Sequence, residues 1–310
     1  MNNILSEKKK LMLEEKIDEP RKTDNKYKKN NKYIFKIIFP LTLIICSICE
    51  KFFKYQYIKT KFNYVLDDIP NYDHTHKTNN TIFWCWFQGE EYAPKLYSSG
   101  LNSIRMNLKN FNIITINDNN IENYVHFPSY IMKKYNDKKI TRTHFSDLLR
   151  LELLIKYGGT WIDASVLISN YTESYFNKDL FFFRERTFEA VGSSWFLTSE
   201  KESPILKITR DLLYEYWRKN NELSYYFLLH YFFRMSFNRY KKDYRNMPII
   251  SNVPSHILQY ELLLKPFQLD KYKEILDLIS VHKLTYKIEP NVTNGLFYHF
   301  IIREFGLKNK

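Results

Sequence analysis

The sequence Ser146-Asp147-Leu148-Leu149-Arg150, followed by Tyr157-Gly158-Gly159-Thr160-Trp161-Ile162-Asp163, decides the fold of this chain. Apolar residues recur at helical spacing up to Tyr157, which places the first motif on a helix with Asp147 and Arg150 on one face. The glycine pair predicts the end of that helix and a tight entry into a strand. Asp163 then stands at the carboxyl end of the strand, where open α/β sheets bind ligands. We therefore expect Asp147, Arg150 and Asp163 to converge on one site.

The surrounding segments predict an α/β sheet of the nucleotide-binding type. Strand and helix patterns alternate along the chain, with strands at 81–86 and 112–117 and helices at 94–108, 141–157, 204–220 and 223–237. Thr141 or Thr143 can cap the 141–157 helix. On the last helix, His230 is either a buried core histidine or a contact to an acceptor. Neither Gly-x-Gly-x-x-Gly nor a P-loop occurs in the sequence, so kinases, P-loop NTPases and Rossmann dehydrogenases have no support.

The two motifs resemble those of capsular polysaccharide synthesis proteins and, more distantly, of glycosyltransferase family 32. Members of these groups carry Ser-Asp-x-x-Arg, then Tyr-Gly-Gly, then a motif similar to Asp-x-Asp. The stretch Ile82-Phe83-Trp84-Cys85-Trp86-Phe87-Gln88-Gly89 also resembles the first strand and nucleotide loop of the family, and the similarity spans roughly residues 60–300. The resemblance implies a GT-A-like, Rossmann-type sheet that binds a nucleotide-sugar, with added C-terminal helices and an N-terminal helical extension.

The same resemblance implies a glycosyltransferase of the hexosyltransferase type. It would move a sugar, with retention, from a nucleotide-sugar (UDP-linked) to a hydroxyl of a capsular or other cell-surface polysaccharide, and the acceptor would be a glycan or a lipid-linked glycan. Asp147, Arg150 and Asp163 are the expected catalytic residues. The expected contacts to the nucleotide-sugar are Trp84, Trp86, Gln88, Gly89, Asp147, Arg150 and Lys283. Two other functions stay open, a glycoside hydrolase and a non-catalytic carbohydrate-binding or assembly protein at the membrane.

The expected metal site departs from the family motif. A full Asp-x-Asp would place a second carboxylate at position 165, but the chain reads Asp163-Ala164-Ser165. A serine hydroxyl is a poorer ligand than a carboxylate for a hard cation such as Mn²⁺ or Mg²⁺. We expect one of these cations to be bound by Asp163, with Ser165 and His299 as further ligands.

Each tryptophan of the first strand, Trp84 or Trp86, either stacks on the nucleobase or packs in the core.

The composition of the chain limits the classes of molecule that it is expected to bind. The 310 residues carry a net charge of +13, with an isoelectric point near 9.3, which favours anionic partners such as nucleotide-sugars and phospholipid headgroups. No zinc, helix-turn-helix or RNA-binding signature accompanies this charge, so we expect no nucleic acid partner. Cys46 and Cys49 lie in an apolar run without a second Cys/His pair, and together with Cys85 they are expected to be buried thiols.

The N-terminal part divides by composition into two segments. Residues 1–33 predict a disordered basic tail, residues 34–70 an apolar and basic helical segment, and residues 71–310 the glycosyltransferase domain. The apolar run from Ile37 to Cys49 is interrupted by Lys36 and Pro40 and is shorter than the roughly 20 residues that a spanning helix needs. The segment is expected to lie on an anionic membrane surface, to anchor the chain in one pass through residues 34–49, or to pack on the domain. The expected location is cytoplasmic, at the inner face of the membrane.

Overall fold

The computed structural model describes residues 25–67, 79–185, 191–285 and 294–306, and side chains from Pro40 onward. The chain divides into two compact units, Met1–Phe52 and Phe53–Lys310. The predicted boundary at residues 70 and 71 falls on residues outside the described ranges. Residues 1–24 of the predicted tail also lie outside them.

The first unit contains most of one long helix, α2 (Asn25–Phe62). The helix begins at Asn25 and continues through Pro40, so residues 25–33 are helical rather than part of a disordered tail. Cys46 and Cys49 are exposed on it, and only Cys85 is buried, so the prediction of three buried thiols was wrong for the first two. No helix in the described ranges has the length and apolar content to cross a membrane, α2 with the predicted anchor residues 34–49 included.

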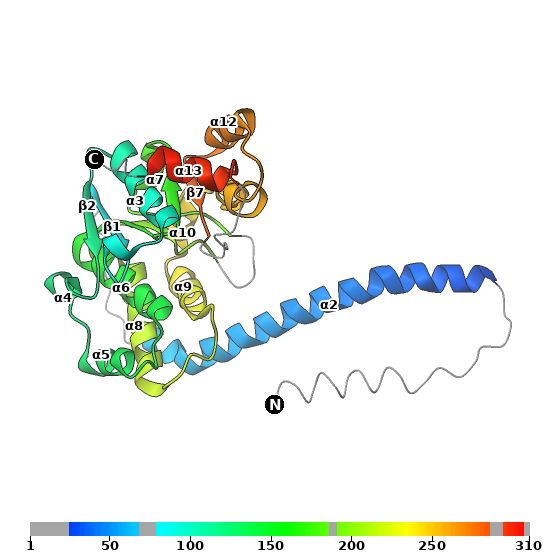
Figure 1. The fold of residues 1–310 in the computed structure, drawn as a ribbon. Coiled ribbons are helices and arrows are strands. Elements are labelled where there is room, and N and C mark those ends of the chain that lie inside the picture. The colour runs from blue at the N-terminus through cyan, green and yellow to red at the C-terminus, as the bar shows by residue number, and fades with distance from the viewer. Residues whose placement is uncertain (1–24, 68–78, 186–190, 286–293, 307–310) are drawn as a thin grey trace. The chain divides into compact units, whose positions relative to one another are not determined.

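The second unit is a mixed α/β fold around a five-stranded sheet, as predicted (Figure 1). The sheet order is β2-β1-β3-β6-β5, and a separate two-stranded sheet pairs β4 with β7. The strands are β1 (Thr81–Cys85), β2 (Asn112–Ile116), β3 (Gly159–Ile162), β4 (Val166–Ile168), β5 (Leu180–Phe182), β6 (Phe196–Ser199) and β7 (Val281–Lys283). β2, β1 and β3 are parallel, whereas β6 is antiparallel to both of its neighbours. All strands of the large sheet except β6 therefore run in one direction.

Helices surround both sheets (Figure 1). After α2 they are α3 (Lys95–Asn107), α4 (Ile121–Tyr124), α5 (Ser129–Asn136), α6 (Arg142–Tyr157), α7 (Glu173–Phe176), α8 (Pro204–Lys219), α9 (Leu228–Arg239), α10 (Lys241–Asn246), α11 (Val253–Ile257), α12 (Leu269–Leu278) and α13 (Phe297–Phe305). The expected helices at 94–108, 141–157 and 204–220 agree closely with α3, α6 and α8. The last predicted helix begins at Leu228 instead of at residue 223.

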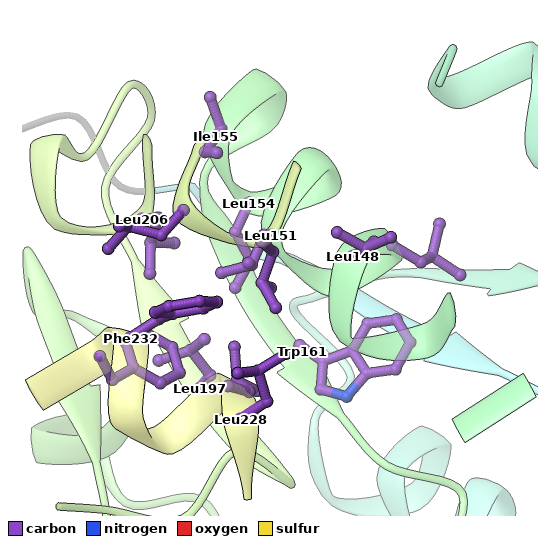
Figure 2. Packing of buried hydrophobic residues seen from close by; sticks show 14 of the residues in the cluster. Leu148, Leu151, Leu154, Ile155, Trp161, Leu197, Leu206, Leu228 and Phe232 are labelled. Atoms are coloured by element: carbon purple, nitrogen blue, oxygen red, sulfur yellow. The ribbon is translucent and has the colours of Figure 1, made fainter. Parts of the chain in front are cut away.

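The central strands are buried on both faces, because neighbouring side chains alternate between two cores. On β1, Phe83 and Cys85 join the core formed with α6, α8 and α9, whereas Ile82 and Trp84 join the core formed with α3 and β4. Figure 2 shows the first core, where leucines of α6 pack with Trp161 and Phe232. The last turns of α2 belong to this core as well, with Tyr55 and Phe62 buried in it.

The glycine pair produces the predicted turn between α6 and β3. Gly158 and Gly159 both have positive φ, at 69° and 99°, a backbone region that favours glycine. At the other end of α6, the Thr141 hydroxyl accepts a hydrogen bond from the His144 backbone amide at 3.4 Å, as expected of an N-cap. The N-cap thus fixes where α6 begins, and the glycine turn fixes where it ends and β3 starts. Asp163 directly follows β3.

Candidate active site

A cavity of about 560 Å³ opens at the carboxyl ends of the parallel strands β1 and β3. Its wall includes residues that follow β1, the start of α6, and residues that follow β3. The lining residues are Cys85, Trp86, Phe87, Gln88, Pro94, Tyr97, Arg142, Thr143, Ser146, Arg150, Trp161, Asp163, Ala164 and Ser165. The cavity therefore lies where open α/β sheets place their ligands, and four residues of the predicted motif line it, namely Ser146, Arg150, Trp161 and Asp163.

The Arg150 guanidinium brings the two acids of the motif together. Its Nη2 lies 3.1 Å from Asp147 Oδ1 and 3.6 Å from Asp163 Oδ1. All three predicted catalytic residues thus meet at one place, although Asp163 comes from a different element than the other two. The carboxylates are joined by one cation, which offsets the repulsion between two negative charges in a partly buried site.

Arg150 is held firmly in this position. Its Nη1 donates to the Ser194 carbonyl at 2.7 Å, and its Nε donates to the Ser146 carbonyl at 3.2 Å. The guanidinium also lies over the Trp161 ring, 5.2 Å from the ring centroid, where a cation is attracted by the aromatic face. Since most of its hydrogen-bonding capacity serves the protein, Arg150 acts first as a support for the acids and only in part as a ligand contact.

The two acids differ in access to the cavity. Asp147 is buried, is not part of the cavity wall, and lies 3.4 Å from His144 Nδ1 as well as beside Arg150. Asp163 lines the cavity, with 27% of its side chain exposed. Asp163 therefore faces the cavity, whereas Asp147 lies beside Arg150 and outside the cavity wall.

The Asp163 carboxylate is kept ionised by its surroundings. Burial alone would raise its pKa, but the charges of Lys283 and Arg150 and hydrogen bonds from Trp161 and Lys283 outweigh burial and lower the pKa. Trp161 Nε1 donates to Oδ1 at 2.7 Å, and Lys283 Nζ donates to Oδ2 at 3.2 Å. Both carboxylate oxygens thus have a partner from the protein.

Lys283 reaches the site from the far end of the chain. It lies on β7, which pairs with β4 directly after the motif. Its Nζ also donates to Ser165 Oγ at 2.8 Å and lies 5.3 Å from the centroid of the Trp195 ring. The structure thus brings Lys283, a predicted contact to the nucleotide-sugar, next to Asp163.

The residues predicted to bind a metal do not assemble into a ligand set. Asp163 and Ser165 lie together, but the Lys283 ammonium lies between them. His299 lies on α13, packs against Tyr298, and is absent from the cavity wall. Within the described ranges, no group of three or more His, Cys, Asp or Glu side chains is placed to hold a metal ion. The side chains that the structure describes thus do not fit the cation that the motif implies.

Of the four residues on and after β1 that were predicted to contact the nucleotide-sugar, two line the cavity. Trp84 is fully buried in the core with α3 and does not line the cavity, so of its two predicted alternatives the structure agrees with core packing. Trp86 and Gln88 line the cavity, whereas Gly89 is buried outside the wall and donates from its backbone to the Trp86 carbonyl at 2.9 Å. The Trp86 indole nitrogen is buried without a hydrogen-bond partner among the described residues. Strand alternation places Trp84 and Trp86 on one face, and both contact the same core, Trp84 fully buried in it and Trp86, just after β1, partly buried against it.

Two histidines beside Asp147 were not predicted as site residues from the motif. His144 stands one helical turn before Asp147, which is the signal that the sequence offered for it. For His230 the sequence allowed two interpretations, a buried core histidine or a contact to an acceptor. Burial lowers its pKa to about 4, while the nearby Asp147 charge opposes that shift, so it lies near the acid pair as an uncharged imidazole.

Comparisons with known proteins found a family model and solved structures to which the chain is similar. A family model described as "Capsular polysaccharide synthesis protein" matches residues 44–301. The solved structure of the PaToxG glycosyltransferase is 18% identical, covering 62% of this chain and 79% of its own, with a TM-score of 0.38. The apo-form glycosyltransferase GlyE of Streptococcus pneumoniae TIGR4 is 10% identical, covering 74% of this chain and 61% of its own, with a TM-score of 0.41. The search of curated proteins gave no match.

Proposed function

The chain belongs to the capsular polysaccharide synthesis protein family, and on that premise we propose that it transfers a sugar from a UDP-sugar to a polysaccharide hydroxyl. Its enzyme class is glycosyltransferase, and its general role is in capsular polysaccharide synthesis. The donor, the acceptor, retention at the anomeric carbon and the roles of individual residues are the parts that we propose.

The ion pair between Asp163, which lines the cavity, and Lys283, which lies next to it outside the wall, carries the proposal. An ionised carboxylate and an ammonium, 3.2 Å apart, lie at the carboxyl end of β3 beside a cavity of about 560 Å³. A nucleotide-sugar offers groups for both, since its hydroxyls donate hydrogen bonds and its diphosphate carries negative charge. Cavities of this size are typical of small-molecule sites.

Each side chain of the site has a proposed part in the transfer. Trp86 and Gln88 bind the nucleoside, and Lys283 offsets the charge that grows on the departing diphosphate. Asp163 accepts hydrogen bonds from the donor sugar. Asp147 and Arg150 act as positioning residues, because Asp147 is outside the cavity wall and Arg150 is held by protein carbonyls. Catalysis then consists mainly of orienting the donor and the acceptor.

Glycoside hydrolysis is less well supported by the electrostatics of the site. A hydrolase needs one carboxylic acid that stays protonated to assist the leaving oxygen. The carboxyl that faces the cavity, Asp163, has a lowered pKa and two cationic neighbours. Such a group stays ionised, which suits a transferase that binds a phosphorylated donor.

A thermal-shift screen tests the proposal. The full chain is heated with UDP-, GDP-, ADP- and dTDP-linked sugars, and a ligand that binds only the folded state raises the melting temperature. We expect UDP-sugars to give the largest shift and to be consumed when a glycan acceptor is added. Cleavage of unactivated glycosides without any nucleotide-sugar would contradict the transfer reaction.

We also propose that α2 lies on an anionic membrane surface, near a lipid-linked acceptor. Within the first unit the helix exposes a run of large apolar residues, namely Leu41, Leu43, Ile44, Ile45, Ile48 and Phe52. Lysines precede and follow this run in the sequence, as expected of a segment at a charged lipid interface. Co-sedimentation with vesicles that contain phosphatidylserine should weaken when Ile44 and Ile48 are both changed to Asp. Unchanged co-sedimentation of that double variant would contradict this placement.

A further inference from the structure

The position between Asp163 and Ser165 is taken by a side chain of the protein. In an Asp-x-Asp motif this is where two carboxylates hold a divalent cation against the donor phosphates. Here Lys283 Nζ donates to Asp163 Oδ2 at 3.2 Å and to Ser165 Oγ at 2.8 Å. The ammonium thus bridges the first and third positions of the motif with a positive charge of its own.

Pairing of β4 with β7 sets this position through the backbone. Val166, the residue after Ser165, pairs with Lys283, and the Leu284 amide donates to the Ser165 carbonyl at 2.8 Å. The lysine is therefore held next to Ser165 by the sheet. Its side chain is 14% exposed, lies 5.3 Å from the centroid of the Trp195 ring, and stands outside the cavity wall next to Asp163 and Ser165, which line it. A side chain anchored at its base and packed along its stem stays close to the two oxygens.

The oxygen atoms nearby are poorly suited to a divalent cation. Asp163 supplies the only carboxylate of the bridge, and its two oxygens already accept from Trp161 and Lys283. Two positive groups, Lys283 and Arg150, lie within 3.6 Å of that carboxylate, and they would repel a second cation bound to it. Mn²⁺ and Mg²⁺ prefer several oxygen ligands, commonly carboxylates, and the described residues place no such group here.

We propose that the Lys283 ammonium takes the place of the divalent cation, so that the enzyme binds the donor diphosphate without a metal. This inference rests on the proposed function. During transfer the bond between the anomeric carbon and the diphosphate oxygen breaks, and the electron pair leaves with the diphosphate. The acceptor oxygen forms the new bond to that carbon and releases its proton to the diphosphate. Lys283 forms no covalent bond and stabilises the charge of the leaving group as a point charge.

Calorimetric titration of the full chain with UDP tests the inference. The dissociation constant is measured in EDTA and again with Mn²⁺ or Mg²⁺, and GDP, ADP and dTDP are titrated in the same way. We expect one nucleoside diphosphate to bind in EDTA with an affinity within about twofold of that measured with metal, because an ammonium supplies the counter-charge. Binding that needs Mn²⁺ or Mg²⁺ would overturn the inference and leave the proposed function standing.

Two variants separate the lysine from other sources of affinity. Lys283→Met keeps the length of the stem and removes the charge, and it should weaken binding in EDTA by at least about tenfold, as expected for a lost charge-assisted contact. Lys273→Met, on the exposed face of α12, is the matched control and should leave binding unchanged. Equal affinities for Lys283→Met and the control would overturn the inference.

A double variant should convert the site to metal dependence. Ser165→Asp with Lys283→Ala restores two carboxylates and removes the ammonium, so binding should become weak in EDTA and recover with Mn²⁺. A double variant that binds equally well in EDTA and in Mn²⁺ would show that neither cation contacts the diphosphate, which contradicts the inference. If no nucleoside diphosphate binds the unaltered chain under any of these conditions, the proposed function fails, and this inference fails with it.

Discussion

The two sides of the cavity are built in opposite ways. On one side, α6 and β3 follow each other in the chain and carry Asp147, Arg150 and Asp163. On the other side, Ser165 directly precedes β4 and Lys283 ends β7, and the two residues are separated by 118 positions. The first side is shaped by local rules, namely a cap, a helical period and a glycine turn. The second depends on a strand pairing that only the complete fold can form.

Because of this difference, we expect the two sides to have different functions. The α6–β3 side contains the buried acid and the guanidinium, both held by hydrogen bonds and ion pairs of the protein. The β4–β7 side delivers one cation to the exposed edge of Asp163. Changes on the first side should therefore affect folding as well as turnover, and changes on the second should affect mainly the binding of a phosphorylated ligand.

Gly159→Ala should break the α6–β3 side and have the largest effect. A Cβ at this position would lie 2.4 Å from the Thr81 carbonyl oxygen, and φ is +99°. Backbone strain and the clash together should lower the free energy of unfolding by about 4 kcal/mol, measured by urea denaturation. Gly295→Ala is the control, because φ is +94° there and nothing lies within 4 Å. A control as unstable as Gly159→Ala would show that close approach to β1 is unimportant.

Asp163→Asn tests the residue at which the two sides meet. The amide keeps the size of the side chain and removes the charge that Lys283 and Arg150 share. We expect turnover of the nucleotide-sugar to fall about a hundredfold, or about 2.7 kcal/mol in barrier height, because a positioned charge at the reacting centre is lost. Asp137→Asn, an exposed residue after α5, should leave turnover unchanged. Wild-type turnover in Asp163→Asn would remove Asp163 from the mechanism.

Gly100→Ala reaches the β4–β7 side from α3. Its Cβ would lie 2.5 Å from the Val166 carbonyl oxygen, so β4 has to move away. The gain in helix propensity of about 1 kcal/mol offsets part of the clash, and the free energy of unfolding should fall by about 2 kcal/mol. Because β4 positions Ser165 and β7, calorimetry should also show weaker binding of UDP. Unaltered UDP binding in a destabilised variant would mean that the Lys283 position tolerates a displaced β4.

Most of the first side could be predicted from the sequence, because the relevant residues interact over short spans. Thr141, the glycine pair and Asp163 each follow a local rule of capping, backbone conformation or strand end. The paired strand under Lys283 could not be predicted, since nothing near residues 281–283 names β4 as its partner. The choice between the two alternatives for Trp84 also needed the complete fold. Its burial depends on α3 packing over the sheet, which the pattern of its own strand does not specify.

The smallest expected effect is on stability in acid, where the buried His282 of the β4–β7 side should lower the free energy of unfolding. His282 on β7 is fully buried, its Nε2 lies 3.1 Å from Ser169 Oγ, and burial lowers its pKa to about 4 from an ordinary 6.5. Because the folded protein disfavours the charged imidazole, this residue contributes full stability above pH 6.5, and the contribution falls as the pH drops toward 4. Between pH 7.5 and 5.5 the unaltered chain should lose about 1 kcal/mol more than His282→Gln, measured by urea denaturation at both values. Equal losses would show that His282 can take up a proton without unfolding, and that the β4–β7 side is more open to water than its packing indicates.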